Sequence, residues 1–500
     1  MRSLLFQTGL AALATIAALA IFLFGRERPT VAVTGGLIRG VSTVDGTALF
    51  RSIPFARPPV GELRWKPPMP VEAWEGIRDV SHDAPPCLQA PFGWNDSLAA
   101  VSSEDCLYLQ IRTPRMDAQA KLPVMVWIHG GGNQAGAGRG YTRSPIVKRG
   151  IVLVMLQYRL GAFGFISHPE LTAESPHKAS GNYALQDQIA ALQWVHDNIA
   201  AFGGDPTNVT VFGQSAGAQD VGLLMVTPLS EGLFSKAIAQ SGTATFAAAI
   251  RTREENEQLG ERLVRNAGVS GIAELRRKTG AEILQAAHAL VPPGTHDSLW
   301  LRAIIDGWVI RESPWDTLAS GKQHRVPLII GNNTREFSMS GGPERAQSAI
   351  KSAFKDNAPA AMKLYQLDVN EIASDELAAQ IATDITFRCP ALSVAGFHAA
   401  AGLPVWHYEF GLSKEPSEPV HHSSELPFVF YELPVGARGA PRVTLQDYWT
   451  QFARASDPNT SPLPRWAPFG SERASLFIDQ NGPKLVHGLR RDLCALLQAP

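Results

Sequence analysis

Cysteine is scarce in this 500-residue sequence, which contains only Cys87, Cys106, Cys389 and Cys494. None of them belongs to a C-x-x-C pair, so the sequence does not indicate a zinc site or a thioredoxin-like redox site. The four thiols are either buried and free or joined in disulfides, for which several pairings exist. The redox state of the compartment decides between these alternatives.

An excess of charge of either sign is also missing. The formal net charge is −1 at pH 7, and the sequence has no basic block. Because nucleic-acid-binding proteins usually present a basic surface, this composition argues against a nucleic-acid partner. Hydrophobic residues make up 45% of the chain and charged residues 18%, as in a globular protein with an ample core. No repeat, low-complexity tract or clear linker occurs, so we predict that residues 30–500 form a single domain.

Only one apolar run is long enough to cross a bilayer. Residues 3–25 carry no charge and lie between Arg2 and Arg26. We interpret residues 1–28 as a secretory signal peptide or an uncleaved N-terminal membrane anchor, and we prefer the cleaved signal. Either interpretation exports the rest of the chain, to the periplasm, the medium or the outer face of the bacterial inner membrane. Disulfides are plausible there.

Apolar runs that alternate with helical patterns predict an α/β fold. Residues 123–128 and 151–158 are almost wholly apolar, as in strands buried on both faces of a mainly parallel sheet. Residues 183–202 have an apolar helix face, and a strand follows at once. Further strands are predicted at 208–213, 236–240, 326–330, 405–410 and 476–478. The patterns of residues 254–290 and 343–402 predict helical insertions around one sheet.

The sequence Gly213-Gln214-Ser215-Ala216-Gly217 has the form G-x-S-x-G. This pattern occurs by chance in glycine-rich turns. Here it joins a predicted strand to a predicted helix, and that context is typical of a nucleophile elbow. Such a turn forces its central residue into a strained backbone conformation and exposes the side chain above the sheet. The helix N-terminus also favours developing negative charge. Ser215 is therefore the candidate nucleophile.

A run of three glycines, Gly130 to Gly132, follows His129 and the strand at 123–128. Glycine leaves backbone N–H groups unobstructed, as an oxyanion hole requires. A turn of the HGGG type supplies such donors together with the N–H of the residue after the nucleophile, which is Ala216. Taken alone, the run would be read as a flexible loop. The elbow downstream favours the oxyanion hole.

Two later loops supply a candidate acid and a candidate base. Glu336 follows the strand at 326–330, and His422 follows the strand at 405–410. The order Ser215, Glu336, His422 is the order expected for this type of fold. From the residues alone, Glu336 could equally be a solvated loop acid. His421 competes with His422 for the role of base.

Several long motifs resemble those of type-B carboxylesterases, the family that includes cholinesterases and bacterial para-nitrobenzyl esterases. The resemblance extends from about residue 30 to residue 494 and covers residues 53–61, 103–109, 127–132, 158–161, 181–188 and 202–206 as well as the elbow. It implies an α/β-hydrolase fold with a large, mostly parallel central sheet and helical insertions around an active-site gorge.

The resemblance also assigns residues. The family's acid matches Glu336, five residues after Gly331, and its histidine pattern matches His422 rather than His421. The oxyanion donors match Gly131, Gly132 and Ala216, and the disulfides match Cys87–Cys106 and Cys389–Cys494. The ion pairs Arg64–Glu104 and Arg159–Asp187 match structural pairs of the family.

Four residues mark departures from the family or candidate pocket positions. Gln214 stands where cholinesterases have glutamate, which removes a negative charge. Trp94 lies in the same disulfide loop as the choline-binding tryptophan of cholinesterases, but its spacing from Cys106 is different. Phe337 replaces the usual glycine after the acid, and Phe246 falls near the acyl-pocket region. We expect Trp94, Gln214, Phe246 and Phe337 to line the substrate pocket, although aromatic residues are more often plain packing residues.

The resemblance implies a serine hydrolase that cleaves small-molecule carboxylic esters through an acyl-enzyme. It implies no metal and no organic cofactor, and membrane contact only through an uncleaved anchor. Amide, thioester and carbamate hydrolysis use the same machinery and remain alternatives. A further alternative is a non-catalytic adhesion protein of the same fold. Such relatives typically lack a triad residue, whereas this sequence has all three matched positions.

Overall fold

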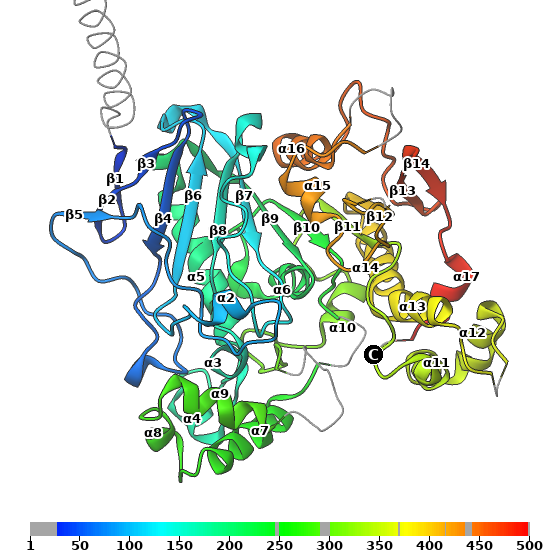
Figure 1. Cartoon of the computed structure of the whole chain (residues 1–500), viewed down its shortest axis with the longest axis horizontal. Helices are drawn as coiled ribbons and strands as arrows, with labels where there is room; N and C mark the ends of the chain where they lie inside the picture. The colour runs from blue at the N-terminus through cyan, green and yellow to red at the C-terminus, as the bar shows by residue number, and fades with distance from the viewer. Residues whose placement is uncertain are drawn as a thin grey trace, which may run out of the picture.

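The computed structural model describes residues 28–245, 250–290, 301–368, 371–415, 417–435 and 443–498 (Figure 1). Most of the predicted signal or anchor segment, residues 1–27, lies outside the described residues, and so does Phe246. No helix in the described parts of the chain combines the length and the apolar character that a membrane crossing requires.

Eleven of the described strands form one sheet, with the order β14-β13-β12-β11-β10-β9-β7-β8-β6-β4-β3. Their bounds are β3 Val41–Ser42, β4 Ala48–Pro54, β6 Tyr108–Thr113, β7 Leu122–Ile128, β8 Val152–Leu156, β9 Gly204–Gln214, β10 Lys236–Gln240, β11 Leu328–Asn333, β12 Val405–Phe410, β13 Ala474–Asp479 and β14 Gly482–His487. A second sheet consists of β1 Thr30–Val33, β2 Gly36–Arg39 and β5 Ile77–Asp79.

The centre of the large sheet is parallel, and its two edges are antiparallel. Every adjacent pair from β8 through β7, β9, β10, β11 and β12 to β13 is parallel. The pairs β13–β14, β8–β6, β6–β4 and β4–β3 are antiparallel. The carboxyl ends of the parallel strands therefore meet at one edge of the sheet, where sites in open α/β folds form.

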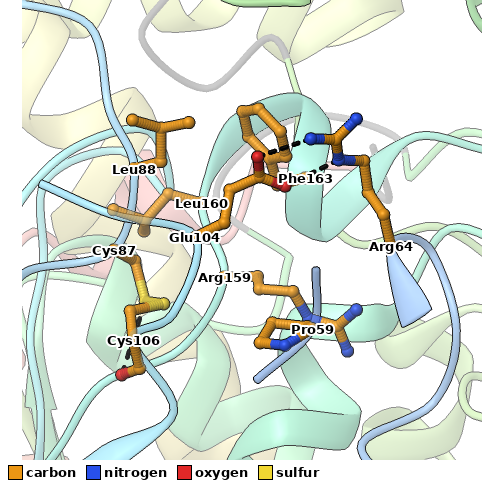
Figure 2. A pocket seen from close by; sticks show the side chains of 9 residues that line it. All are labelled: Pro59, Arg64, Cys87, Leu88, Glu104, Cys106, Arg159, Leu160 and Phe163. Atoms are coloured by element: carbon orange, nitrogen blue, oxygen red, sulfur yellow. Dashed lines mark hydrogen bonds and ion pairs between the residues drawn. A yellow bond between two sulfur atoms is a disulfide. The ribbon is translucent and has the colours of Figure 1, made fainter. Parts of the chain in front are cut away.

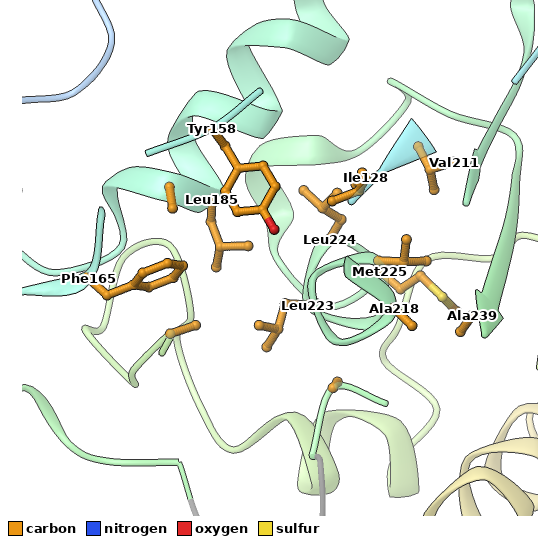
Figure 3. Packing of buried hydrophobic residues seen from close by; sticks show 14 of the residues in the cluster. Ile128, Tyr158, Phe165, Leu185, Val211, Ala218, Leu223, Leu224, Met225 and Ala239 are labelled. Atoms are coloured by element: carbon orange, nitrogen blue, oxygen red, sulfur yellow. The ribbon is translucent and has the colours of Figure 1, made fainter. Parts of the chain in front are cut away.

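Alternate residues of the central strands pack on opposite faces, and this explains their continuous apolar runs. In β7, Val126 and Ile128 join the larger core cluster with α5 (Tyr183–Asn198) and α6 (Ala216–Leu224). Figure 3 shows Leu223 and Leu224 of α6 in this cluster. Met125 and Trp127 of the same strand join the second cluster, with α15 (Leu426–Phe430) and α16 (Leu445–Ala455). Helices thus cover both faces of the sheet.

The remaining described helices surround this sheet. Helices α4, α7, α8 and α9 gather at one end of the molecule, and α11, α12 and α13 lie beyond α14 (Figure 1). Their bounds are α2 Asp96–Ala99, α3 Gly161–Phe165, α4 Pro169–Glu174, α7 Arg253–Asn266, α8 Ile272–Leu275, α9 Gly280–His288, α10 Pro314–Ala319, α11 Ala346–Phe354, α12 Ala358–Tyr365, α13 Asp375–Thr383, α14 Cys389–Ala400 and α17 Arg491–Cys494. The predicted α/β fold with helices around a mostly parallel sheet is confirmed.

Both disulfides, Cys87–Cys106 and Cys389–Cys494, are formed, and no cysteine of the sequence is left free. Figure 2 shows the first disulfide beside a cavity of about 10 Å³ that is also lined by Arg64, Glu104 and Arg159. Arg64 donates to Glu104 at 2.6 and 2.5 Å, and Arg159 donates to the buried Asp187 at 2.8 and 2.7 Å. These contacts link segments that are distant in the sequence. Disulfides of this kind indicate folding in an oxidising environment.

Candidate active site

Four segments converge where the parallel strands end. His129 follows β7, Ser215 follows β9, Glu336 lies three residues after β11, and His422 lies in the loop after β12. Because these strands are parallel, their carboxyl ends lie at the same edge. Residues far apart in the sequence are thereby brought to one cavity.

The turn at Ser215 has the strained geometry of an elbow. Ser215 has φ 59° and ψ −126°, outside the regions that residues other than glycine normally adopt, and it caps α6. The flanking glycines are required by close packing. A Cβ at Gly213 would collide with the carbonyl of Gly217, and a Cβ at Gly217 would collide with the carbonyl of Ile128. The backbone N–H of Ser215 donates to the Gln240 carbonyl at 2.9 Å, which anchors the turn to β10.

The glycine loop after β7 faces this turn. Gly131 and Gly132 have φ values of 110° and 66°, and a Cβ at Gly130 would lie 2.6 Å from the carbonyl oxygen of Gln214. No described residue accepts a hydrogen bond from the N–H of Gly131, Gly132 or Ala216. Three backbone donors near Ser215 are therefore left for an anion, as an oxyanion hole requires.

His422 is held by Glu336. The imidazole Nδ1 lies 2.7 Å from Glu336 Oε2, and the backbone N–H of His422 donates to the Glu336 carbonyl at 3.1 Å. The Glu336 carboxylate is buried and also accepts the N–H of Asn333 at 2.7 Å. An ionised carboxylate only accepts hydrogen bonds, so Nδ1 carries the proton and Nε2 is left as the basic atom.

The partner of Nε2 is Gln214 and not Ser215. Gln214 Nε2 lies 3.1 Å from His422 Nε2, and no hydrogen bond joins the Ser215 hydroxyl to His422. The expected line of hydroxyl, imidazole and carboxylate is therefore incomplete between Ser215 and His422. The physical reason is that a neutral amide N–H can donate to the same lone pair that a serine hydroxyl would use. Catalytic hydrogen bonds are often loose before substrate binds.

A buried carboxylate that the sequence did not single out connects the glycine loop to α6. Asp220 Oδ1 accepts from Asn133 Nδ2 at 3.1 Å, and Oδ2 accepts from Gln188 Nε2 at 2.6 Å. Asn133 directly follows Gly132, Asp220 lies in α6, and Gln188 lies in α5. Burial without a cationic partner raises the pKa of Asp220 to about 7. Asp220 thus braces the loop and the helix that carry the three N–H donors.

These groups line one cavity of about 920 Å³. Its lining includes Ser215, Glu336, His422 and the glycine loop, together with the predicted pocket residues Trp94, Gln214 and Phe337. His421 also lines the cavity, but its Nδ1 contacts Ser424 Oγ at 2.9 Å, so it is not the histidine that Glu336 holds. Phe337 packs against the His422 ring, with the ring centroids 4.2 Å apart.

Three further residues near the site were not predicted to act there. Asn333 Nδ2 donates to the buried Glu425 at 2.7 Å and lies 3.3 Å from Glu336 Oε2, so it bridges two carboxylates. Arg335 lines the cavity beside Glu336. The residue pattern alone does not reveal the contact between Asn333 and Glu425, because the two residues are 92 positions apart in the sequence. Arg335 could have been found from its place next to the candidate acid.

Within the described residues, no group of three or more His, Cys, Asp or Glu side chains is arranged to hold a metal ion. The arrangement of Ser215, the Glu336–His422 pair and the free N–H donors is suited to nucleophilic attack on a carbonyl carbon.

Comparisons with known proteins agree with this chemistry. The sequence model of a family described as "Carboxylesterase family" matches residues 27–496. The chain is 34% identical over 459 residues to the fumonisin B1 esterase of Sphingopyxis macrogoltabida, covering 87% of this chain and 83% of that protein. It is 31% identical over 530 residues to liver carboxylesterase 1 of Oryctolagus cuniculus, covering 93% and 92%.

Solved structures show the same similarity. A PNB esterase structure superposes with a TM-score of 0.80 at 30% identity, covering 95% of this chain and all of that one. A carboxylesterase of Geobacillus stearothermophilus superposes with a TM-score of 0.76 at 31% identity, covering 94% and 100%.

Proposed function

The chain belongs to the carboxylesterase family and is an ester hydrolase, and from this premise we propose that Ser215, His422 and Glu336 are its catalytic triad. In this proposal Ser215 attacks the ester carbonyl while His422 Nε2 takes the hydroxyl proton. Glu336 holds the Nδ1–H tautomer and stabilises the imidazolium that forms. The observation that carries the proposal is the 2.7 Å contact between Glu336 and His422 in the cavity that also contains the strained Ser215.

The first step requires His422 Nε2 to exchange partners. In the resting arrangement the Gln214 side-chain amide donates to His422 Nε2. The Ser215 hydroxyl must displace this amide before it can transfer its proton to Nε2. The new bond joins Ser215 Oγ to the carbonyl carbon, and the carbonyl oxygen becomes an oxyanion. The N–H groups of Gly131, Gly132 and Ala216 then stabilise this charge, and losing one such donor typically costs about 10²–10³ in kcat.

The tetrahedral intermediate collapses to an acyl-enzyme. His422 returns its proton to the leaving alkoxide, and the alcohol departs. A water molecule, deprotonated by His422, then attacks the acyl carbonyl and releases the acid and free Ser215. All proton transfers pass through Nε2, and this explains why the partner of that atom matters.

The finer assignment of the compartment is also part of the proposal. We propose that residues 1–28 export the chain and that the protein acts in the bacterial periplasm or outside the cell, with or without a retained anchor. The two disulfides support an oxidising location. Trp94, Gln214 and Phe337 are proposed to contact the substrate, which is supported by their place in the cavity lining.

The proposal is tested with Ser215→Ala. Turnover of a short-chain 4-nitrophenyl ester should fall by a factor of about 10⁶, because no other hydroxyl can form the acyl-enzyme. A fluorophosphonate probe should label the wild-type protein and fail to label the variant. Ser456→Ala is a matched control, since Ser456 also has a positive φ but caps the far end of α16. Labelling of Ser215→Ala, or undiminished turnover, would remove Ser215 from the mechanism.

A further inference from the structure

One arginine side chain lines the cavity beside the candidate triad. Arg335 precedes Glu336, and its side chain is 27% exposed. Among the described residues its only ion pair joins Nε to Glu376 at 3.5 Å, a contact that does not meet hydrogen-bond geometry. The Glu376 side chain is itself 81% exposed, so solvent screens this pair. The two terminal nitrogens of the Arg335 guanidinium therefore have no described partner and can bind a ligand.

Arg335 and Glu336 carry opposite charges in the described lining, but no described ion pair joins the two side chains. Glu336 is the only carboxylate in the described lining, and it is occupied by His422 and Asn333. Gln214 is neutral at the position before the nucleophile. The unpartnered nitrogens of the Arg335 guanidinium can therefore attract an anionic group at short range, and low-dielectric walls strengthen such an attraction.

The walls of the same cavity are apolar and unusually exposed. Trp94, Phe337 and Phe92 are large hydrophobic residues with exposed fractions of 65%, 52% and 48%, and all three line the cavity. Exposed aromatic side chains grouped around a concavity mark a surface that gains free energy when an apolar ligand covers it. The volume of about 920 Å³ is large enough for a substrate with a long chain.

We propose that the substrate is an amphipathic carboxylic ester that carries a free carboxylate. Its apolar chain lies against Phe92, Trp94 and Phe337, and its carboxylate accepts two parallel hydrogen bonds from the Arg335 guanidinium. The carboxylate takes no part in the reaction, which adds one water across the ester bond and releases an acid and an alcohol. This proposal rests on the proposed ester hydrolysis at Ser215 and names the class of substrate for that site.

Two pairs of esters test the proposal, one for each side of the ester bond. On the acyl side, the mono-4-nitrophenyl ester of octanedioic acid is compared with 4-nitrophenyl octanoate. On the alcohol side, 4-(octanoyloxy)benzoate is compared with 4-(octanoyloxy)benzamide. The quantity measured is the ratio of kcat/KM for the anionic ester to kcat/KM for its neutral partner. In the wild-type enzyme at low salt, at least one pair should show a ratio above one, and the ratio should fall as ionic strength rises.

Arg335→Gln should lower that ratio about tenfold or more, because a charge-assisted hydrogen bond to the carboxylate is lost. Arg335→Lys should retain part of the ratio, since it keeps the charge but not the planar fork. Glu376→Gln removes the competing acid and should raise the ratio. Arg311→Gln is the matched control, because Arg311 is exposed and outside the cavity lining, and its ratio should equal that of the wild type.

A ratio that Arg335→Gln leaves unchanged in both pairs would overturn the proposal, even if that variant were uniformly less active toward all four esters. Failure of the proposed function has a different signature. In that case the wild-type protein would turn over none of the four esters and would not react with the fluorophosphonate at Ser215.

Discussion

At the scale of single residues, the basic nitrogen of His422 has two possible donors. Gln214 and Ser215 are neighbours in the sequence, and both side chains line the cavity that His422 faces. The amide holds Nε2 at 3.1 Å. A glutamate at position 214 could not donate to Nε2 when ionised, so glutamine at this position changes the chemistry and does more than remove a charge.

Gln214→Glu should shift the acid limb of the kcat/KM profile to higher pH. An anion beside the imidazole favours the imidazolium over the neutral base, so turnover should require a higher pH. The profile should be measured from pH 5 to pH 9 with a neutral 4-nitrophenyl ester. Gln214→Met removes the donor without adding charge and should not produce the upward shift. An acid limb that stays in place in Gln214→Glu would contradict the contact seen in the structure.

At the scale of elements, two helices and one loop meet at a single carboxylate. Asp220 in α6 binds Asn133 of the glycine loop and Gln188 of α5. Asn133 itself is held by the N–H of Gly161, which donates to its carbonyl at 2.7 Å. The three N–H donors of the proposed oxyanion hole therefore depend on packing that spans elements about 90 residues apart in the sequence.

The raised pKa of Asp220 predicts a pH-dependent stability. The native pKa of about 7 exceeds the ordinary value of 3.8, so the folded state favours the protonated carboxyl. The contribution of Asp220 to the free energy of unfolding is therefore greatest below about pH 4. It decreases as the pH rises toward about 7. The shift of about three units corresponds to a total of about 4 kcal/mol at most.

Asp220→Asn should remove this dependence. The new amide can accept from Asn133 and donate to Gln188 Oε1, which has no partner among the described residues. Urea unfolding at several pH values between 4.5 and 7.5 should show the difference in stability between variant and wild type growing in favour of the variant as pH rises. Asp492→Asn, which changes an exposed carboxylate, serves as the control. A difference that is constant with pH would show that Asp220 does not titrate in this range.

At the scale of the whole molecule, the two disulfides close loops of very different size. Cys87 and Cys106 are 19 residues apart, whereas Cys389 and Cys494 are 105 residues apart. The longer loop runs from the start of α14 to the end of α17 and contains β12, the loop of His422, α16 and the last two strands. The disulfide ties α17 to α14, which packs against β11 and β12 of the sheet that positions the site.

Removal of the disulfide that closes the longer loop should destabilise the protein more than removal of the other disulfide. In the chain-entropy account, a loop of about 100 residues contributes about 5 kcal/mol and one of about 20 residues about 3 kcal/mol. Cys389→Ala/Cys494→Ala should therefore lower the free energy of unfolding in urea more than Cys87→Ala/Cys106→Ala. Equal effects, or the reverse order, would show that contacts in the folded state outweigh loop closure.

Much of the fold was predictable because it depends on local patterns. The strands predicted at 236–240 and 405–410 have those bounds in the structure. The helical region 254–290 divides into α7, α8 and α9, because Gly268 takes a left-handed conformation and Thr279 caps a new helix. Strand β14 was not predicted, because it is an edge strand with one buried residue and lacks an apolar run.

The sequence by itself determined the local turns from which the candidate site is built. The spacing of Gly213, Ser215 and Gly217 encodes a strained turn, since only glycine avoids collision where strand and helix meet. The glycine run after β7 is likewise a property of a short stretch of chain, whereas Glu336 and His422 were assigned only by the resemblance to the family.

Only the tertiary structure decided which side chains meet. Gln214 contacts His422 Nε2, Asp220 binds the glycine loop, and Arg335 lines the cavity. These contacts result from packing between segments that are tens to hundreds of residues apart in the sequence. The physical reason is that backbone conformation responds to neighbouring residues along the chain. Hydrogen-bond partners and local charge are instead set by elements that come together only when the sheet forms.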